Sequence, residues 1–347
     1  MVLQSISLQN IRSYFNYKLE LEAPALVVVG GNATGKTTIL EAILLATTGE
    51  SFRAGEIAEL IKFNAELGRL EVGLLSDTVE VIVTRGSVQG KKTIGRLFSV
   101  NGVRRRRKDA MGRVYPVLFR PEDMRLIEGS PARRRLFLDA ALCVFHQEYR
   151  VAHKVYEQTL RRRNKLLTQV RDREQPASAL TYWNLGMVKH GEVLQKFRQQ
   201  FLQSYAAHQF ALPFTVRYEP SVISAERQAQ YLPREIAAGH SLIGPHKDDY
   251  MVFLPLGGEL RSIAAFGSRG QQRLAVLWLK LGELRYAERQ QLPVILLLDD
   301  ILSELDTQSR EHALALIPQY QSIITSTDRE TLEMVAAVQP SVQLVET

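Results

Sequence analysis

One feature constrains the fold of this chain more than any other, the stretch VVVGGNATGKTTILEAI from Val27 to Ile43. An apolar, β-branched run leads into a glycine-rich turn with the spacing G-x-x-x-x-G-K-[ST], and a helical pattern follows the turn. Glycines in such a turn can adopt positive φ, so that successive backbone N–H groups point to one place and form an anion nest. The helix adds free N–H groups and the positive end of its dipole to that place. The stretch therefore predicts an α/β fold with a phosphate site.

The residues of this loop are those expected to hold ATP and Mg²⁺. Lys36 would reach the β- and γ-phosphates, and the Thr37 hydroxyl would ligate Mg²⁺. The candidate nucleotide contacts are Gly30, Gly31, Asn32, Ala33, Thr34, Gly35, Lys36, Thr37 and Thr38. A chance glycine-rich turn is the alternative, and the strand before the loop and the helix after it argue against that interpretation.

A second apolar run, VILLLDD at 294–300, supplies the acidic half of a nucleotide site. Five apolar residues that end in two aspartates are typical of a buried parallel strand, and ligands of open α/β sheets lie at the carboxyl edge of the strands. We expect Asp299 to hold Mg²⁺ and Asp300 to polarise the attacking water as a catalytic residue, together with Lys36. A buried strand that runs into an Asp-rich turn is the structural alternative.

A third stretch, Phe266–Arg273, lies just before an apolar helix. Ser268 is a good helix N-cap, and Gly270 allows backbone to come close to a ligand. This would be a second anion-binding helix end, but the first loop already encloses the phosphates of one nucleotide. A face-to-face dimer resolves the conflict, because Ser268 of one copy could contact the γ-phosphate held by the other copy.

These residues carry a resemblance to known ATPases. Ser268–Gln271 resembles the ABC-type signature motif, and Ser303–Asp306 resembles the D-loop that follows the second motif of those proteins. Within that superfamily the chain resembles the RecF family of DNA replication and repair ATPases. Further stretches that carry the resemblance are Asn10–Tyr14, Phe119–Asp123, Gly129–Pro131, Arg133–Arg135 and Gly244–Asp249. The resemblance implies an ABC-type ATPase head with a short inserted α-helical arm, and it implies nucleotide contacts from Ser268, Gly270, Gln271 and Asp306.

The resemblance also implies a role. RecF-like proteins bind ATP, dimerise on it, engage duplex DNA near single-strand gaps, and help RecO and RecR to place the recombinase RecA. The chain departs from the general ABC pattern at Asp300, where most members carry glutamate, so we expect slow ATP hydrolysis. No histidine occurs near Thr325–Asp328, where ABC proteins place a γ-phosphate switch, and Ser326 or Thr327 could substitute.

Positive charge is concentrated in one segment of the chain. The formal net charge is +7, yet residues 101–200 alone hold 22 Lys and Arg against 10 Asp and Glu. Solvated helix faces explain many basic runs, but so uneven a segment favours a polyanion partner such as double-stranded or gapped DNA. The candidate DNA contacts are Arg104, Arg105, Arg106, Arg107, Lys108, Arg133, Arg134, Arg161, Arg162 and Arg163.

Strand and helix patterns divide the chain into three parts. Residues 1–118 read as strands around the phosphate loop, residues 119–213 as a helical arm, and residues 214–347 as the return to the ATPase lobe. Two long helices are expected in the arm, one ending near Arg173 and one from Leu180 to Gln209. Helices of about 30 residues would make an arm about 45 Å long.

Composition bounds the location of the protein. A single cysteine, Cys143, excludes an internal disulfide. The start of the chain lacks the apolar core of a signal peptide, and no run approaches the ~18 apolar residues of a membrane helix. These observations predict a cytoplasmic protein without a membrane partner.

Other functions share some of these motifs. The ATP-binding subunit of a membrane transporter would normally carry the switch histidine and would not need a basic arm. A P-loop kinase leaves the stretches at 267–273 and 303–306 without a purpose, and a non-catalytic DNA clamp would bind ATP without turnover. A metal site at His240, His246, Asp248 and Asp249 lacks ligands in a defined spacing, and we expect that loop to lie near the dimer face instead.

Overall fold

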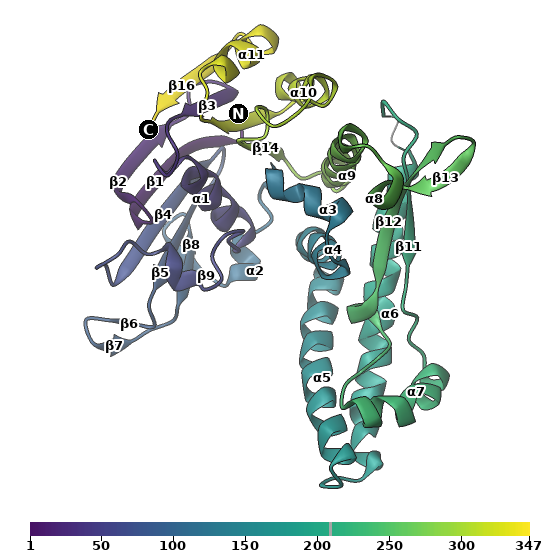
Figure 1. The fold of residues 1–347 in the computed structure, drawn as a ribbon. Helices are drawn as coiled ribbons and strands as arrows, with labels where there is room; N and C mark the ends of the chain where they lie inside the picture. The colour runs from purple at the N-terminus through teal and green to yellow at the C-terminus, as the bar shows by residue number, and fades with distance from the viewer. Residues whose placement is uncertain (208–209) are drawn as a thin grey trace. The chain divides into compact units, whose positions relative to one another are not determined.

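A computed structural model describes residues 1–207 and 210–347 (Figure 1). The chain forms two compact units. Unit 1 contains residues 1–123 and 283–347, and unit 2 contains residues 124–282. Residues 214–282 thus pack with the helical segment, whereas the sequence placed them in the ATPase lobe. Among the described residues, no helix is both long enough and apolar enough to span a membrane.

Unit 1 contains a five-stranded parallel sheet. Its order is β10 (Tyr115–Phe119), β14 (Val294–Asp299), β15 (Gln321–Ser326), β3 (Ala25–Val29) and β16 (Val342–Glu346). Every residue of the four strands β10, β14, β15 and β3 is buried, as expected for a parallel sheet with both faces covered. Because the strands are parallel, the loops that follow them meet at one edge.

A second, antiparallel sheet of unit 1 packs on the same helix. Its order is β2 (Tyr14–Glu20), β1 (Leu3–Ile11), β4 (Leu67–Leu74), β5 (Thr78–Thr84), β8 (Arg96–Val100) and β9 (Val103–Arg105). Helix α1 (Lys36–Thr48) shares one hydrophobic core with both sheets. The remaining elements of unit 1 are β6 (Ser87–Val88), β7 (Lys91–Lys92), α2 (Arg107–Ala110), α10 (Thr307–Leu314), α11 (Glu330–Val338) and the short 3-10 helices at 57–60 and 317–319.

Unit 2 is built on a helical hairpin. Helices α5 (Gln147–Arg171) and α6 (Thr181–Gln203) run side by side, and Figure 1 shows α7 and the strands β11 and β12 along them. The other elements are α3 (Arg125–Glu128), α4 (Pro131–Phe145), α7 (Ala225–Ala238), β11 (Thr215–Glu219), β12 (Asp249–Leu256), β13 (Glu259–Ser262), α8 (Ile263–Phe266) and α9 (Arg269–Arg289), whose residues from 283 onward belong to unit 1. Short 3-10 helices of unit 2 lie at 177–180 and 245–247, and the one at 121–124 falls mostly within the residues of unit 1.

The predicted hairpin exists but is shorter than expected. Helix α5 has 25 residues and α6 has 23, so at ~1.5 Å per residue they span about 38 and 35 Å rather than 45 Å. The second helix ends at Gln203 and gives way to a 3-10 turn at 204–207. Residues 208 and 209 of the predicted helix lie outside the described residues.

Candidate functional site

The phosphate loop joins β3 to α1 in unit 1, as the sequence predicts. Helix α1 begins at Lys36, and Gly35 before it has φ 111°. The other positive φ in the loop is 66° at Ala33, whereas Gly30 and Gly31 keep ordinary φ values. The turn therefore depends on positive φ at fewer glycines than expected. The Thr38 N–H donates to the Gly35 carbonyl at 2.8 Å, which closes the first turn of the helix.

Lys36 lies folded into its own loop. Its Nζ donates to the carbonyl oxygens of Gly30 and Gly31, both at 2.7 Å, and the side chain is buried. The ammonium group thus sits beside the backbone that forms the nest, where a phosphate group would be held. A triphosphate in the loop would replace or share these carbonyl partners.

Replacing Gly35 by alanine is expected to weaken ATP binding by about tenfold or more. A side chain at φ 111° is strained, and the added Cβ would lie 2.8 Å from the Tyr14 ring. Gly86→Ala is the matched control, since Gly86 also has positive φ, 90°, but nothing lies within 4 Å of the added Cβ. Titration with a fluorescent ATP analogue measures both variants. Equal affinities for the two would contradict the role of Gly35.

The two predicted Mg²⁺ ligands lie in contact. Asp299, the last residue of β14, accepts hydrogen bonds through Oδ1 from the hydroxyls of Thr37 at 2.9 Å and Thr325 at 2.8 Å. Burial raises the pKa of the Asp299 carboxyl, and the two hydroxyls oppose that effect. One carboxylate and one hydroxyl suit Mg²⁺, which is commonly held by one or two protein oxygens together with substrate phosphates. The described residues contain no group of three or more His, Cys, Asp or Glu that could hold a metal by themselves.

Thr325 also contacts Asp299, although no sequence motif points to it. It belongs to β15, the strand between β14 and β3, so its hydroxyl reaches Asp299 from the neighbouring strand. Its carbonyl and hydroxyl oxygens also accept the Asp300 N–H, both at 3.1 Å. A threonine near the carboxyl end of a buried strand, next to the strand that carries the aspartates, is the signal that could have identified it.

Asp300 occupies a left-handed backbone position with φ 51°. Its carboxylate accepts long hydrogen bonds, each 3.4 Å, from the Ser303 hydroxyl and the Thr327 N–H. Non-glycine residues in this region of φ cost energy and cluster at functional sites. Thr327 therefore lies beside Asp300. The buried Ser326 hydroxyl does not face Asp300 but pairs with the Thr331 hydroxyl at 2.7 Å.

Arg12 pairs with a carboxylate of the helix that follows the phosphate loop. Its guanidinium makes two hydrogen bonds, at 3.0 and 3.1 Å, to the carboxylate of Glu41, which lies buried on α1. This ion pair fixes the turn between β1 and β2 against the helix of the phosphate loop.

The signature-like residues begin α9 in unit 2. The Ser268 hydroxyl accepts the Gln271 N–H at 3.3 Å, and the Gln271 side chain accepts the Ser268 N–H at 2.9 Å. This reciprocal arrangement is a capping box, so the predicted N-cap is confirmed. Because the hydroxyl oxygen acts as acceptor, its hydrogen can still be donated to an incoming phosphate oxygen. Arg269, within the motif, pairs with Glu128 of α3.

Asp306 caps α10 in unit 1. Its carboxylate accepts the Ser309 N–H at 3.0 Å and the Ser309 hydroxyl at 3.1 Å. The loop between Asp300 and this cap is therefore anchored at both ends. A nucleotide contact from Asp306 stays a prediction.

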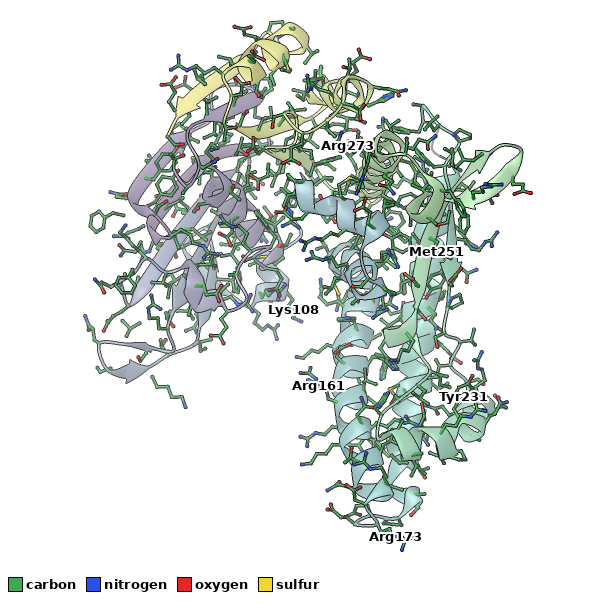
Figure 2. The ribbon with its side chains drawn as sticks, in the orientation of Figure 1. Lys108, Arg161, Arg173, Tyr231, Met251 and Arg273 are labelled. Atoms are coloured by element: carbon green, nitrogen blue, oxygen red, sulfur yellow. The ribbon has the colours of Figure 1, made fainter. Side chains whose placement is uncertain are left out.

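The predicted DNA contacts at 104–108 belong to unit 1 and not to the helical arm. Arg104 and Arg105 lie on the edge strand β9 and are exposed, and Lys108, labelled in Figure 2, is exposed as well. Arg106 pairs with Asp109, whereas Arg107 binds Glu50 and donates to the Thr48 carbonyl at 3.0 Å. Arg107 thus neutralises the C-terminal end of α1, which favours a structural role.

Two predicted DNA contacts of unit 2 have carboxylate partners within that unit, and only the buried Arg163 contradicts its prediction. Arg163 is 1% exposed and donates to Glu235 at 2.6 Å and to the Ser241 hydroxyl at 2.7 Å. Arg134 makes two hydrogen bonds to Asp249, at 2.6 and 2.8 Å. The other predicted contacts, Arg133, Arg161 and Arg162, are exposed, and Figure 2 shows Arg161 on α5.

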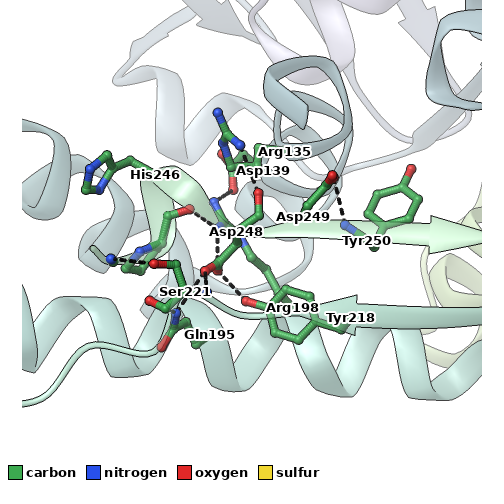
Figure 3. Close-up of polar contacts among 12 residues, drawn as sticks. Arg135, Asp139, Gln195, Arg198, Tyr218, Ser221, His246, Asp248, Asp249 and Tyr250 are labelled. Carbon is green, nitrogen blue, oxygen red and sulfur yellow. Dashed lines mark hydrogen bonds and ion pairs between the residues drawn. The ribbon is translucent and has the colours of Figure 1, made fainter. Parts of the chain in front are cut away.

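The loop at Gly244–Asp249 is the centre of a buried polar network (Figure 3). Asp248 accepts hydrogen bonds from Arg198 at 2.9 Å and from Gln195 at 2.9 Å, both on α6, and from the Tyr218 hydroxyl on β11. Asp248 and Arg198 are both buried within unit 2. The contacts of Asp248 are internal to unit 2, and the expectation that the loop lies near a dimer face stays a prediction.

His246 makes the network sensitive to acid. Its ring bonds to the Tyr156 hydroxyl at 2.8 Å and to the Ser241 carbonyl at 3.1 Å, and burial lowers its pKa to about 4. The folded protein therefore resists protonation of His246, while the unfolded chain accepts a proton near pH 6.5. Its contribution to stability is complete above that pH and is lost as pH falls towards 4.

We expect the wild-type protein to lose about 3 kcal/mol from this residue between pH 7 and pH 4. His246→Gln, which keeps a donor for Ser241, should lose correspondingly less over the same range. Urea unfolding at both pH values measures the difference, and an equal loss in the two proteins would contradict it.

Comparison with known proteins identifies the family of the chain. Residues 2–345 match the family model described as RecF/RecN/SMC N terminal domain. Proteins named DNA replication and repair protein RecF from Lachnoclostridium phytofermentans and Herpetosiphon aurantiacus are 33% and 35% identical, covering 95% and 94% of this chain and 94% of each relative. A solved structure, of "the recombination mediator protein RecF-ATPrS in RecFOR pathway", is 26% identical with a TM-score of 0.84 and covers 94% of this chain and 92% of that one. The chain therefore belongs to the RecF family of DNA replication and repair proteins.

Proposed function

We propose that this protein is an ATP-dependent DNA-binding protein of recombinational repair and replication restart. The observation that carries the proposal is the contact between Thr37 and Asp299, because it joins the phosphate loop to the acidic strand across 262 residues. Family membership and the solved structures of RecF with ATP support a nucleotide at this site. The transporter alternative is not favoured, because the relatives are named as repair proteins.

The residues of the loop have distinct tasks in ATP hydrolysis. The nest and Lys36 bind the phosphates, and Thr37 with Asp299 would hold Mg²⁺, which offsets phosphate charge as hydrolysis proceeds. Asp300 orients and polarises the attacking water. Its side chain is one carbon shorter than that of glutamate, so turnover is slow.

ATP joins two copies of the protein in this proposal. The γ-phosphate held by Lys36 of one copy meets Ser268 of the other, a contact that ADP cannot provide, so ATP favours the dimer. Size-exclusion chromatography with light scattering tests this with a non-hydrolysable ATP analogue. Wild type should dimerise and Ser268→Arg should remain monomeric. A monomeric wild type at saturating nucleotide would refute the shared site.

Exposed cations bind duplex and gapped DNA in the dimer. The exposed candidates are Arg104, Arg105, Arg106, Arg107, Lys108, Arg133, Arg161 and Arg162, of which Arg106 and Arg107 pair with Asp109 and Glu50. Phosphate contacts release counterions, so affinity should fall steeply with salt. Replacing Arg161 and Arg162 together by alanine removes two phosphate contacts, so the negative slope of log K against log[salt] should become shallower by about 2. Arg329→Ala, which removes a cation paired with Glu346, is the control and should leave the slope unchanged.

The DNA-bound dimer acts with RecO and RecR to help load RecA on single-strand gaps. Two alternatives are separated by simple assays. A non-catalytic clamp would release no phosphate with or without DNA, whereas we expect slow release that DNA stimulates. A P-loop kinase would transfer phosphate to a small acceptor.

A further inference from the structure

Thr347, the residue that follows β16, lies on the phosphate loop. Strand β16 runs parallel to β3 with Glu346 opposite Val29, which carries the next residue to the start of the loop. The Thr347 N–H donates to the Val29 carbonyl at 3.0 Å. Its hydroxyl lies 2.8 Å from the hydroxyl of Thr34.

The hydroxyls of Thr34 and Thr347 lie close to two glycines of the phosphate loop, Gly30 and Gly31. Thr34 Oγ1 also donates to the Gly31 carbonyl at 3.0 Å, one of the two carbonyls that Lys36 binds. A Cβ built on Gly30 would lie 2.4 Å from Thr347 Oγ1 and 2.8 Å from Thr34 Oγ1. The first glycine of the loop is therefore covered directly by Thr347, so that side chain helps to define the shape of the loop.

We propose that Thr347 is a positioning residue for nucleotide binding, a role that rests on the proposed ATP site. The hydroxyl pair holds Thr34, and Thr34 holds Gly31, in the arrangement that directs the backbone N–H groups of the loop to one place. Without the pair, ordering the loop has to be driven by ATP itself, which lowers affinity. Thr347 touches neither Asp299 nor Asp300 in any contact among the described residues, so the hydrolysis step at saturating ATP is unaffected.

The test measures ATP affinity and turnover in hydroxyl-removal variants of the full chain. Thr347→Val keeps the shape of the side chain and removes the hydroxyl, and we expect affinity for a fluorescent ATP analogue to fall about two- to tenfold. Turnover at saturating ATP should stay within about twofold of wild type, a split between KM and kcat. Thr347→Ser should restore affinity, because it retains the hydroxyl.

Three further variants separate a shared interaction from independent effects of the two hydroxyls. Thr34→Val should cause at least as large a loss, because it removes both the hydroxyl pair and the bond to Gly31, and the double variant should be no worse than Thr34→Val alone. Thr331→Val is the control, since it breaks a 2.7 Å hydroxyl pair with Ser326 that does not involve the loop side chains. Unchanged affinity in Thr347→Val, or additive losses in the double variant, would overturn the role of Thr347. Failure of wild type to bind the analogue would instead refute the ATP site.

Discussion

Replacing Asp248 by alanine is expected to lower the free energy of unfolding by about 3–5 kcal/mol. The reason is that Arg198 would stay buried with one of its two carboxylate partners removed. Tyr218, Gln195 and the Ser221 N–H would also lose the acceptor that now serves all three. Denaturant unfolding followed by fluorescence measures the change.

An exposed ion pair of the same unit provides the control. Glu259 and Arg261 pair at 3.1 Å with side chains 73% and 45% exposed, so Glu259→Ala should cost less than about 1 kcal/mol. A loss in Asp248→Ala no larger than in this control would show that the buried network does not stabilise unit 2.

Replacing Lys36 by methionine is expected to reduce ATP turnover by about 100-fold or more. Methionine has a similar length but no charge, so it can neither attract the β- and γ-phosphates nor offset the charge that develops during hydrolysis. Phosphate release measures turnover, and light scattering with the ATP analogue should show that the variant stays monomeric.

Lys62→Met is the matched control for this change. Lys62 also donates through Nζ to a backbone carbonyl, that of Ser13 at 3.0 Å, but it lies outside the phosphate loop. Its turnover should equal that of wild type. If Lys36→Met still hydrolyses ATP within tenfold of wild type, the assignment of Lys36 is wrong.

Much of unit 1 could be predicted because its signals are local. The strand, loop and helix around Lys36 are contiguous in the sequence, and the apolar run before Asp299 can only be a buried strand in such a fold. The rule that parallel strands meet at one edge then brings Thr37 and Asp299 together, as the structure has them. The contact of Thr325 with Asp299 could not be predicted, because it depends on β15 lying between β14 and β3, and no single segment of the sequence determines the order of the strands.

The partners of the arginines could not be predicted, because they come from distant parts of the chain. Glu235 is 72 residues from Arg163, and Asp249 is 115 residues from Arg134. Helical periodicity could have indicated that Arg163 is buried, because Arg163 lies on the same face of α5 as the buried residues Tyr156, Thr159 and Leu167. A basic cluster in sequence therefore contains both inward and outward arginines, and helical spacing separates them better than charge does.

The network around Asp248 has a mechanical consequence for unit 2. Arg198 of α6 binds Asp139 of α4 and Asp248 beside β12, and its guanidinium also meets Tyr149 of α5. Arg198 thus connects α4, α5, α6 and the start of β12 at the base of the hairpin. A force applied to the exposed side of α5 near Arg161 would therefore reach the Arg198 network at the base of the hairpin, because that network resists bending of the helices at the base.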